Sequence, residues 1–372
     1  MRIAILGGGQ LARMMALAGL PLGFRFDIAD PAADACAATL GRFHQAAYDD
    51  QVMLDELADN ADLATFDFEN VPQAAARYLA DKIPFYPTPA ALEFAQDRLL
   101  EKQLFNSLDI PTAEFYPVSS RTDLLAAIEK TGYPAVLKTR RLGYDGKGQF
   151  VLEQAEDLER AWQQLGDFEL ILEQFIRFDG ECSVIGVRGR DGETRFWPLS
   201  RNHHRQGVLS LSIAPFSDVD LQAAAQPLCS RLMDHFDYTG VLALELFFKD
   251  GHLLANELAP RVHNSGHWTI EGAACSQFEN HLRAIAGLPL GETGALGHSL
   301  MVNWIGALPD RQQALSIPGV HWHDYGKTAR PGRKMGHATV HTETQQQRLA
   351  SARRLAALAD DDLERAVDQL LG

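Results

Sequence analysis

Cysteines are few in this sequence, and none is spaced for a metal site or a disulfide framework. The chain of 372 residues has four, Cys36, Cys182, Cys229 and Cys275, and no two of them form a C-x-x-C pair. Structural zinc sites and small secreted domains depend on closely spaced cysteines. The sequence therefore predicts a protein of the reducing cytoplasm that is held together by apolar cores.

Long apolar segments and excess positive charge are also missing. The longest uncharged run, at about residues 293–309, contains glycines, His298, Asn303 and a proline, which makes it a poor membrane span. The polar stretch GGGQLARM interrupts the apolar N-terminus, so a strand and a helix are expected there rather than a signal peptide. A net charge of −15 disfavours general binding to nucleic acid or to anionic membranes.

What is present is an ordinary globular composition, with 46% hydrophobic and 22% charged residues, in a chain long enough for two or three domains. In residues 1–90, short apolar segments alternate with helical ones, which predicts a parallel α/β sheet. We expect a helix at 10–23 and strands at 2–8, 24–30, 63–69 and 83–88. The proline-rich segment 83–92 indicates a domain boundary.

The rest of the chain mixes helices with strands. We expect helices at 91–108, 218–237 and 277–288, strands at 133–138, 148–153 and 168–176, and hairpins at 181–200 and 240–258. The first hairpin would turn at Asp191-Gly192. A smaller C-terminal unit beginning near residue 296 would end in a helix over 344–371.

A glycine motif lies between the first expected strand and helix. Residues Gly7–Ala12, GGGQLA, match G-x-G-x-x-A, and Asp27 and Asp30 follow at a suitable distance to bind a ribose. This pattern is compatible with a dinucleotide fold. A tight strand–helix turn in any α/β domain gives the same match, so both interpretations stay open.

A second glycine-rich segment follows the apolar run YPAVLK. Residues 140–149, RRLGYDGKGQ, contain three glycines and a lysine but no P-loop, because G-x-x-x-x-G-K-[ST] is absent. Two strands joined by such a tip can close over the phosphates of a nucleotide, and Lys138 is placed to reach a phosphate. The alternative is a solvated hairpin tip.

Two glutamates interrupt the apolar strands of the hairpin 240–258. Glu245 lies in VLALELFF and Glu257 in LLANELAP, and buried carboxylates are costly without partners. A two-residue turn would place them on opposite faces, whereas an odd-numbered loop or a bulge would place them opposite each other on one face. Together they would suit Mg²⁺ and ligand phosphates. The alternative is two separate Glu–Arg pairs, with Arg261 as one partner.

Two polar loops complete the set of motifs. Arg261, His263 and Asn264 follow the glutamate hairpin, and a guanidinium with a histidine and an amide suits a small planar oxyanion. The loop at 325–337 has four cations in an acidic protein: Lys327, Arg330, Arg333 and Lys334. Such a cluster suits a phosphate-bearing substrate. Alternatively, the first loop holds a satisfied histidine and the second is a solvated basic loop.

Several segments, taken in order, resemble those of the ATP-grasp enzymes: QDRLLEKQLF, PAVLKTRRLGYDGKGQ, LEQFI, GEC, ALELF, NELAPRVHNSGHW and RPGRKMGH. More narrowly, the chain is similar to the N5-carboxyaminoimidazole ribonucleotide synthases of purine biosynthesis, from GGGQL to GRKMGH. The resemblance implies an α/β and α+β enzyme with a Rossmann-like pre-ATP-grasp domain at 1–97, a two-lobed ATP-grasp region at 98–295 and a C-terminal domain at 296–372. Within the second part, a nucleotide lid would span about 110–175 and the carboxylate hairpin about 240–258.

The resemblance implies an ATP site made from several segments. Its residues would be Arg98, Lys138, the loop Gly143, Tyr144, Asp145, Gly146, Lys147, Gly148 and Gln149, the hinge Glu173, Gln174, Phe175 and Ile176, and Glu181, His204, Asn256 and Glu257. Arg98, Lys138 and the loop would contact phosphates, the hinge would bind adenine largely through backbone groups, and Glu181 would bind the ribose. His203 is adjacent to His204 and competes with it for its position. Glu245 and Glu257 would hold Mg²⁺ or Mn²⁺.

The same resemblance implies the second substrate site and the catalytic residues. The residues facing 5-aminoimidazole ribonucleotide would be Gln10, Glu69, Tyr144, Asp145, Lys327, Arg330, Arg333 and Lys334. The catalytic residues would be Lys138, Asp145, Arg261, His263 and Asn264, the last three where bicarbonate and carboxyphosphate form. Asp145 is our hypothesis for orienting the amine or accepting its proton.

The implied reaction converts ATP, bicarbonate and 5-aminoimidazole ribonucleotide into N5-carboxyaminoimidazole ribonucleotide, ADP and phosphate, in a homodimer. Three alternatives stay open: another ATP-grasp carboxylase or ligase with a different phosphorylated acceptor, a nicotinamide-dependent oxidoreductase built on GGGQLA, and a nucleotide-binding regulator without activity. The oxidoreductase leaves the glutamate hairpin and the 143–149 loop without a role, and the intact carboxylates disfavour the regulator.

Overall fold

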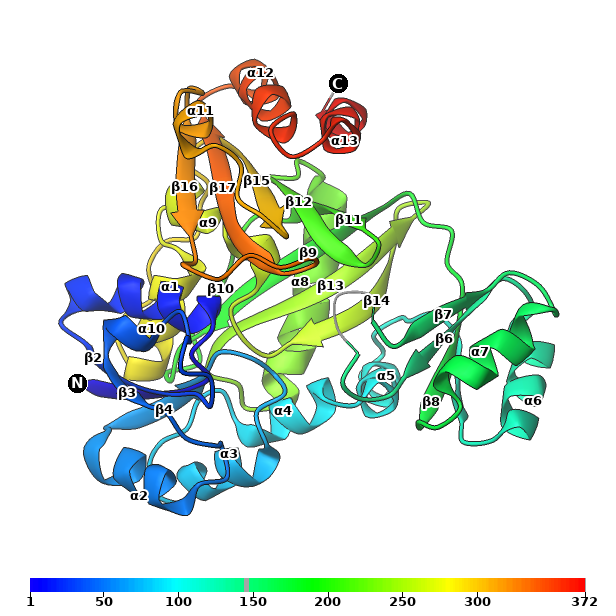
Figure 1. Cartoon of the computed structure of the whole chain (residues 1–372), viewed down its shortest axis with the longest axis horizontal. Helices are drawn as coiled ribbons and strands as arrows, with labels where there is room; N and C mark the ends of the chain where they lie inside the picture. The colour runs from blue at the N-terminus through cyan, green and yellow to red at the C-terminus, as the bar shows by residue number, and fades with distance from the viewer. Residues whose placement is uncertain (144–146, 372) are drawn as a thin grey trace.

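Three β-sheets organise the chain, whose computed structural model describes residues 1–143 and 147–371. Figure 1 shows a parallel sheet near the N-terminus at the lower left, a second small sheet projecting at the right, and a nine-stranded sheet between them. The mixed α/β and α+β architecture expected from the sequence is confirmed. Among the described residues, no helix has the length and apolar character needed to cross a bilayer.

The N-terminal sheet is parallel, as the alternation of segments predicts. Its strands lie in the order β3 (Arg42–His44), β2 (Arg25–Ala29), β1 (Arg2–Leu6) and β4 (Leu63–Phe66). Helices α1 (Gln10–Gly19), α2 (Gln51–Asn60) and α3 (Gln73–Ala80) and the short turns η1 (Leu20–Leu22) and η2 (Ala38–Leu40) accompany them. The sequence does not predict β3, because three residues carry too little of an alternating pattern.

The strand expected at 83–88 is wrong. Only Phe85 forms a bridge, to Ala64 of β4, flanked by hydrogen bonds from the Ala64 N–H to the Pro84 oxygen at 2.8 Å and from the Tyr86 N–H to the Ala64 oxygen at 2.9 Å. Pro84 and Pro87 have no N–H to donate, so the pairing does not extend into a ladder.

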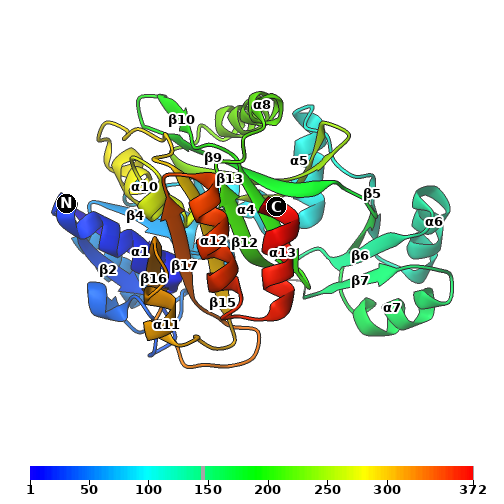
Figure 2. The ribbon, with the colours of Figure 1, turned by 90° about the horizontal axis from the view of Figure 1, so that it is seen from above.

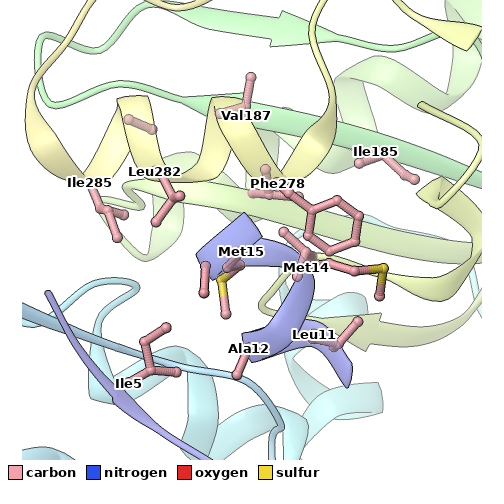
Figure 3. Packing of buried hydrophobic residues seen from close by; sticks show 14 of the residues in the cluster. Ile5, Leu11, Ala12, Met14, Met15, Ile185, Val187, Phe278, Leu282 and Ile285 are labelled. Carbon is pink, nitrogen blue, oxygen red and sulfur yellow. The ribbon is translucent and has the colours of Figure 1, made fainter. Parts of the chain in front are cut away.

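Helix α1 is buried on two sides. One cluster of buried side chains contains Met14 and Met15 of α1, Ile5 of β1, and Phe278 and Leu282 of α10 (Gln277–Ala286). Figure 3 shows α1 lying between β1 and α10. The end of the helix has no room for a side chain, since a Cβ on its last residue would lie 2.8 Å from the Leu282 side chain. The N-terminal sheet and the ATP-grasp region therefore share one core.

The single helix expected at 91–108 is wrong, because two helices meet at Asp97. Helix α4 spans Pro89–Ala95 and α5 spans Arg98–Ser107. The Asp97 carboxylate accepts hydrogen bonds from the N–H groups of Leu99 and Leu100, which makes it the N-cap of α5. It also binds the Arg140 guanidinium at 2.7 Å. The aspartate thus starts a new helix where the apolar pattern continues without interruption.

The lid has a sheet and a core of its own. Its strands lie in the order β5 (Phe115–Val118), β8 (Leu170–Gln174), β6 (Ala135–Thr139) and β7 (Gln149–Leu152), and α6 (Arg121–Thr131) and α7 (Asp157–Leu165) pack on them. Figures 1 and 2 show this unit projecting from the rest of the molecule. The strands on both sides of the glycine-rich segment are those expected from the sequence.

The nine-stranded sheet extends through the expected C-terminal unit. Its order is β14-β13-β9-β11-β12-β15-β17-β16, with β10 paired to β9. The bounds are β9 Gly180–Arg188, β10 Thr194–Phe196, β11 Ser200–Arg205, β12 Val208–Ala214, β13 Gly240–Lys249, β14 His252–Ala259, β15 His298–Ile305, β16 Val320–Asp324 and β17 Lys334–Thr342. Strand β15 pairs directly with β12, so the unit that starts near residue 296 adds strands to a sheet already begun.

The remaining helices lie around this sheet. They are α8 (Val219–His235), η3 (Asn264–Gly266), α9 (Thr269–Gly272), α11 (Arg311–Leu315), α12 (Gln345–Ala356) and α13 (Asp361–Leu371). The single helix expected over 344–371 is wrong, because Asp360 lies between α12 and α13. Its carboxylate accepts the Leu363 N–H at 2.8 Å and binds Arg205 at 2.7 Å. The hairpin expected at Asp191-Gly192 is confirmed by the pairing of β9 with β10.

Candidate functional site

A cavity of about 1180 Å³ opens where the three sheets meet. Most of the site residues expected from the sequence line it: Gln10, Glu69, Arg98, Lys138, Lys147, Gln149, Glu181, His204, Glu245, Asn256, Glu257, Arg261, His263, Asn264, Lys327, Arg330, Arg333 and Lys334. These residues come from the N-terminal domain, the lid, the central hairpin and the loop before β17. The fold thus brings together motifs that are far apart in the sequence.

A β-bulge places the two glutamates of the hairpin opposite each other. The turn between β13 and β14 has two residues, with Lys249 paired to His252, and this register alone would set Glu245 against Asn256. The register shifts after Glu245, so that Glu245 pairs with Glu257 and Asn256 is the extra residue. Neighbouring residues at a bulge escape the strict alternation of a strand, and both Asn256 and Glu257 line the cavity.

Histidines surround the Glu245 carboxylate. Nε2 of His263 lies 3.0 Å from one oxygen, and Nε2 of His204 lies 3.9 Å from the other. Burial alone would raise the pKa of Glu245, but the two histidines lower this pKa to about 2. His204 also contacts Glu181 through Nδ1 at 2.7 Å. Of the two adjacent histidines, His204 lines the cavity and His203 does not.

Charged side chains on the lid side of the cavity form a network of ion pairs. Arg98 binds Glu257 at 3.2 Å, and Lys138 binds Glu173 at 2.9 Å. Lys102, which is fully buried, lies 3.6 Å from the same glutamate and donates to the Ala255 oxygen at 3.2 Å. Burial would raise the pKa of Glu173, but the two lysines lower this pKa to about 2. The network holds the lid strand β8 against β14 and keeps cations at the cavity wall.

The polar loop after β14 forms another part of the cavity wall. Arg261 forms an ion pair with Glu69. Nδ1 of His263 forms a hydrogen bond with the Ser265 hydroxyl at 2.8 Å. Burial would raise the pKa of Glu69, but Arg261 lowers this pKa to about 2. Asn264 is joined to Asn303 of β15 through both groups of its amide. A guanidinium, an imidazole and an amide therefore border one part of the cavity.

The basic loop reaches the N-terminal domain. The Lys327 ammonium contacts the Gln10 side chain, and burial lowers the pKa of this lysine. Arg330, Arg333 and Lys334 line the same end of the cavity. This cluster of cations is a suitable place for the phosphate of a substrate.

Some expected residues do not line the large cavity. The hinge Glu173, Gln174, Phe175 and Ile176 lies outside its wall, as does Gly148, and Gly143 lines a smaller pocket beside Arg98. Tyr144, Asp145 and Gly146 lie outside the described residues.

Asp30, Tyr48 and Asp67 also line the cavity. Of these, the sequence suggests a role only for Asp30, as a ribose ligand in the dinucleotide interpretation. The Asp30 carboxylate accepts the Gly8 N–H at 2.7 Å and the Tyr48 hydroxyl at 3.1 Å. Asp67 lies over the glycine turn, since a Cβ added to Gly7 would be 2.0 Å from its carboxylate. The glycines of GGGQLA thus make room for two carboxylates of the chain, which removes the support for a dinucleotide there.

The hairpin carboxylates fit a divalent cation that also binds phosphates. Among residues 1–143 and 147–371, no group of three or more histidine, cysteine or acidic side chains is arranged as a complete metal site. Two facing glutamates and the amide of Asn256 are the incomplete oxygen set that Mg²⁺ accepts when phosphates supply the other ligands.

Known proteins share this architecture. Three protein families match successive parts of the chain: the ribonucleotide synthetase preATP-grasp domain at 1–96, the ATP-grasp domain at 103–278 and the phosphoribosylaminoimidazole carboxylase C-terminal domain at 299–351. The N5-carboxyaminoimidazole ribonucleotide synthase of Pseudomonas aeruginosa is 55% identical over 340 residues, which cover 91% of this chain and 94% of the relative.

Solved structures agree with the sequence matches. The N5-carboxyaminoimidazole ribonucleotide synthetase of Thermus thermophilus superposes with a TM-score of 0.93 at 48% identity, covering 96% of this chain and 99% of that one. The N5-carboxyaminoimidazole synthase of Aspergillus clavatus, solved with ADP and 5-aminoimidazole ribonucleotide, superposes with a TM-score of 0.87 at 31% identity, covering 99% and 98%.

Proposed function

The chain belongs to the N5-carboxyaminoimidazole ribonucleotide synthase family of ATP-grasp ligases, and on that premise we propose how its own residues divide the work. The enzyme carboxylates 5-aminoimidazole ribonucleotide with bicarbonate at the expense of ATP, in purine biosynthesis. The observation that carries this assignment is one cavity bordered by the Glu245/Glu257 pair, by Arg261 and His263, and by the basic loop.

ATP binds at the lid side of the cavity. Arg98 and Lys138 contact its phosphates, and Glu181 binds its ribose, with the backbone of the hinge at 173–176 serving adenine. Lys138 pairs with Glu173 in this structure, so binding of a phosphate draws the lysine into a competing ion pair. Phe247, which stacks on Phe178 at 4.5 Å and lines the cavity, supplies an apolar wall near the nucleotide.

Glu245, Glu257 and Asn256 would hold Mg²⁺ or Mn²⁺, which neutralises phosphate charge when it is bound. Around them, Arg98, Lys138 and Arg261 place positive charge where the γ-phosphoryl group transfers. A bicarbonate oxygen attacks the γ-phosphorus, the bond from that phosphorus to the ADP oxygen breaks, and carboxyphosphate results. Arg261, His263 and Asn264 hold the bicarbonate for this step.

The second step forms the carbon–nitrogen bond. The amine of the ribonucleotide attacks the carboxyl carbon, the bond from carbon to phosphate oxygen breaks, phosphate leaves, and one amine proton passes to an acceptor. We assign orientation of the amine or acceptance of that proton to Asp145, next to Tyr144. Asp145→Asn with normal turnover would contradict this role. Gln10, Glu69, Lys327, Arg330, Arg333 and Lys334 bind the ribonucleotide.

The deciding experiment measures ADP release from Mg-ATP with the ribonucleotide and bicarbonate each present or omitted. We expect release to require the ribonucleotide, and a labile carboxylated product to require bicarbonate. Turnover without the ribonucleotide would favour another ATP-grasp carboxylase or ligase. Absence of ATP turnover would contradict the assignment of the ATP site.

Domain limits, oligomeric state and compartment complete the proposal. The three domains span 1–97, 98–295 and 296–372. Two copies form a dimer, for which the exposed Leu17 and Leu20 at the end of α1 offer an apolar contact area, and sedimentation velocity tests it. The enzyme works in the cytoplasm, where its four free thiols stay reduced.

A further inference from the structure

Asn303 lies directly behind Asn264 at the edge of the cavity. Asn303 belongs to β15 and is 3% exposed, whereas Asn264 begins η3 and lines the cavity. Two hydrogen bonds join their amides in a reciprocal pair. Nδ2 of Asn303 donates to Oδ1 of Asn264 at 2.7 Å, and Nδ2 of Asn264 donates to Oδ1 of Asn303 at 3.1 Å.

A backbone carbonyl fixes the orientation of this pair. Nδ2 of Asn303 also donates to the Leu209 oxygen at 2.8 Å. Because a carbonyl only accepts, turning the Asn303 amide over would set its oxygen against that of Leu209. Leu209 cannot move away freely, since β12 is paired with β15 in the central sheet. Both N–H bonds of Asn303 are therefore committed, one to Leu209 and one to Asn264.

The orientation passes from Asn303 to Asn264. Asn303 holds its amide oxygen and one N–H at fixed positions. Nδ2 of Asn264 must therefore face that oxygen, and Oδ1 of Asn264 must face that N–H. This uses one of the two N–H bonds of Asn264. The other finds no acceptor among the residues that the structure describes, and the side chain borders the cavity. The carbonyl of Leu209 thus determines where a free donor stands on the cavity wall.

We propose that Asn303 is a positioning residue for the carboxylation reaction. It holds the Asn264 amide in one orientation, so that the free N–H of Asn264 is offered to a small oxyanion beside Arg261 and His263. The inference rests on the proposed function, because it takes bicarbonate as that oxyanion.

A second buried asparagine provides a matched control. Asn202 lies in β11 of the same sheet and is 4% exposed. It donates to Ser183 at 2.6 Å and accepts from Ser212 at 2.9 Å, and none of these three residues lines the cavity. Changes at Asn202 therefore report the cost of disturbing a buried amide without disturbing Asn264.

The test compares Asn303→Asp with Asn202→Asp. The aspartate keeps the shape at 303 but removes both N–H bonds, the one to Leu209 and the one to Asn264. In CO₂-free buffer with saturating ATP and ribonucleotide, we expect KM for added bicarbonate to rise about tenfold, as for the loss of one hydrogen bond. KM for ATP should stay within about twofold, and Asn202→Asp should leave both KM values within about twofold. If Asn303→Asp fails to fold, Asn303→Ser carries the same comparison with Asn202→Ser.

A double-mutant cycle separates positioning from general damage. Asn303→Ala should raise KM for bicarbonate in the wild-type background and have no further effect in an Asn264→Ala background. An undiminished effect there, or equal effects of the changes at 303 and 202, would overturn the inference while leaving the proposed function intact. A wild-type enzyme whose ADP release ignores bicarbonate would overturn the proposed function and this inference together.

Discussion

The buried carboxyl of Asp67 carries a cost that depends on pH. Burial and the charge of Asp30 raise the pKa of Asp67 to about 7, although N–H groups of Gly9 and Ala12 oppose the shift. In the unfolded chain an aspartate titrates near 3.9. Between these two values the folded protein holds one proton more than the unfolded chain. The free energy of unfolding therefore falls as the pH rises toward 7.

Asp67→Asn removes this titration. We expect the variant to gain stability relative to wild type between pH 5 and pH 8, by roughly 2–3 kcal/mol, since each pKa unit corresponds to about 1.4 kcal/mol. Urea unfolding at both pH values measures the difference. The control is Asp59→Asn, at an exposed position of α2. Its free energy of unfolding should change with pH as that of the wild type does. The prediction is wrong if the free energy of unfolding of Asp67→Asn also changes with pH as that of the wild type does.

Glu245→Gln should abolish most of the activity. The change removes one carboxylate of the facing pair, which lies 3.0 Å from Nε2 of His263. We expect ADP release to fall at least about 100-fold, as is typical when charge stabilisation of a transferring phosphoryl group is lost. The matched control is Glu101→Gln, because burial and the charge of Glu257 raise the pKa of Glu101 to about 8 and so keep it largely neutral at pH 7. That variant should stay within about fivefold of wild type.

Sequence patterns find residues that break a local rule. Glu245 in an apolar strand and the cations of the 325–337 loop are such exceptions, and both reach the cavity. Asp67 breaks no rule, because it alternates with Phe66 and Phe68 in the strand expected at 63–69, where a polar residue is ordinary. Its meaning comes from Gly7 and Gly9, which are distant in sequence and packed against its carboxylate. Lys102 is equally hidden, since a lysine within a helix is unremarkable until the fold buries it.

The glutamate hairpin shows what an element reveals in advance. The sequence predicts its two strands, but it leaves open whether the turn has two residues and therefore how the strands are in register. The bulge at Asn256 decides which face Glu257 occupies, and no glycine or other local feature marks it. The helix break at Asp97 is similar, because the capping hydrogen bonds compete with an apolar pattern that would continue the helix.

The hairpin turn can be tested with two glycines. Gly251 has φ of +75° and open space around its Cα, whereas Gly294 also has open space but no left-handed backbone. Gly251→Ala should lower the free energy of unfolding by about 1–2 kcal/mol through strain. Gly294→Ala should leave it unchanged or raise it by up to about 1 kcal/mol. Urea unfolding compares them, and equal effects would show that the turn imposes no left-handed conformation.

The molecule as a whole divides into a large body and a lid. The lid has its own sheet and its own buried cluster, while the N-terminal sheet and the central sheet share side chains in one cluster. Figure 2 shows the lid set apart when the molecule is viewed from above. Units with separate cores can open separately. The sequence indicates the lid as a region, but not that the other two parts are joined.

Hydrogen exchange should resolve this division. Without nucleotide, amides of β6 and β8 should exchange faster than those of β9 and β13, because the lid opens without unfolding the body. A non-hydrolysable ATP analogue with Mg²⁺ should slow exchange in the lid at least about tenfold and leave the body nearly unchanged. Equal protection of lid and body without nucleotide would show that the lid is not an independent unit.

Helix α1 also bears on how such genes can evolve. Because Met14 and Met15 lie in one buried cluster with Phe278 and Leu282, recombination cannot exchange the first domain independently of α10 (Figure 3). A chimera with a crossover near codon 97 would take the α1 side of this buried cluster from one parent and the α10 side from the other. Drift at the two methionines is thereby tied to drift in α10. Chimeras between distant relatives should survive only when both segments travel together.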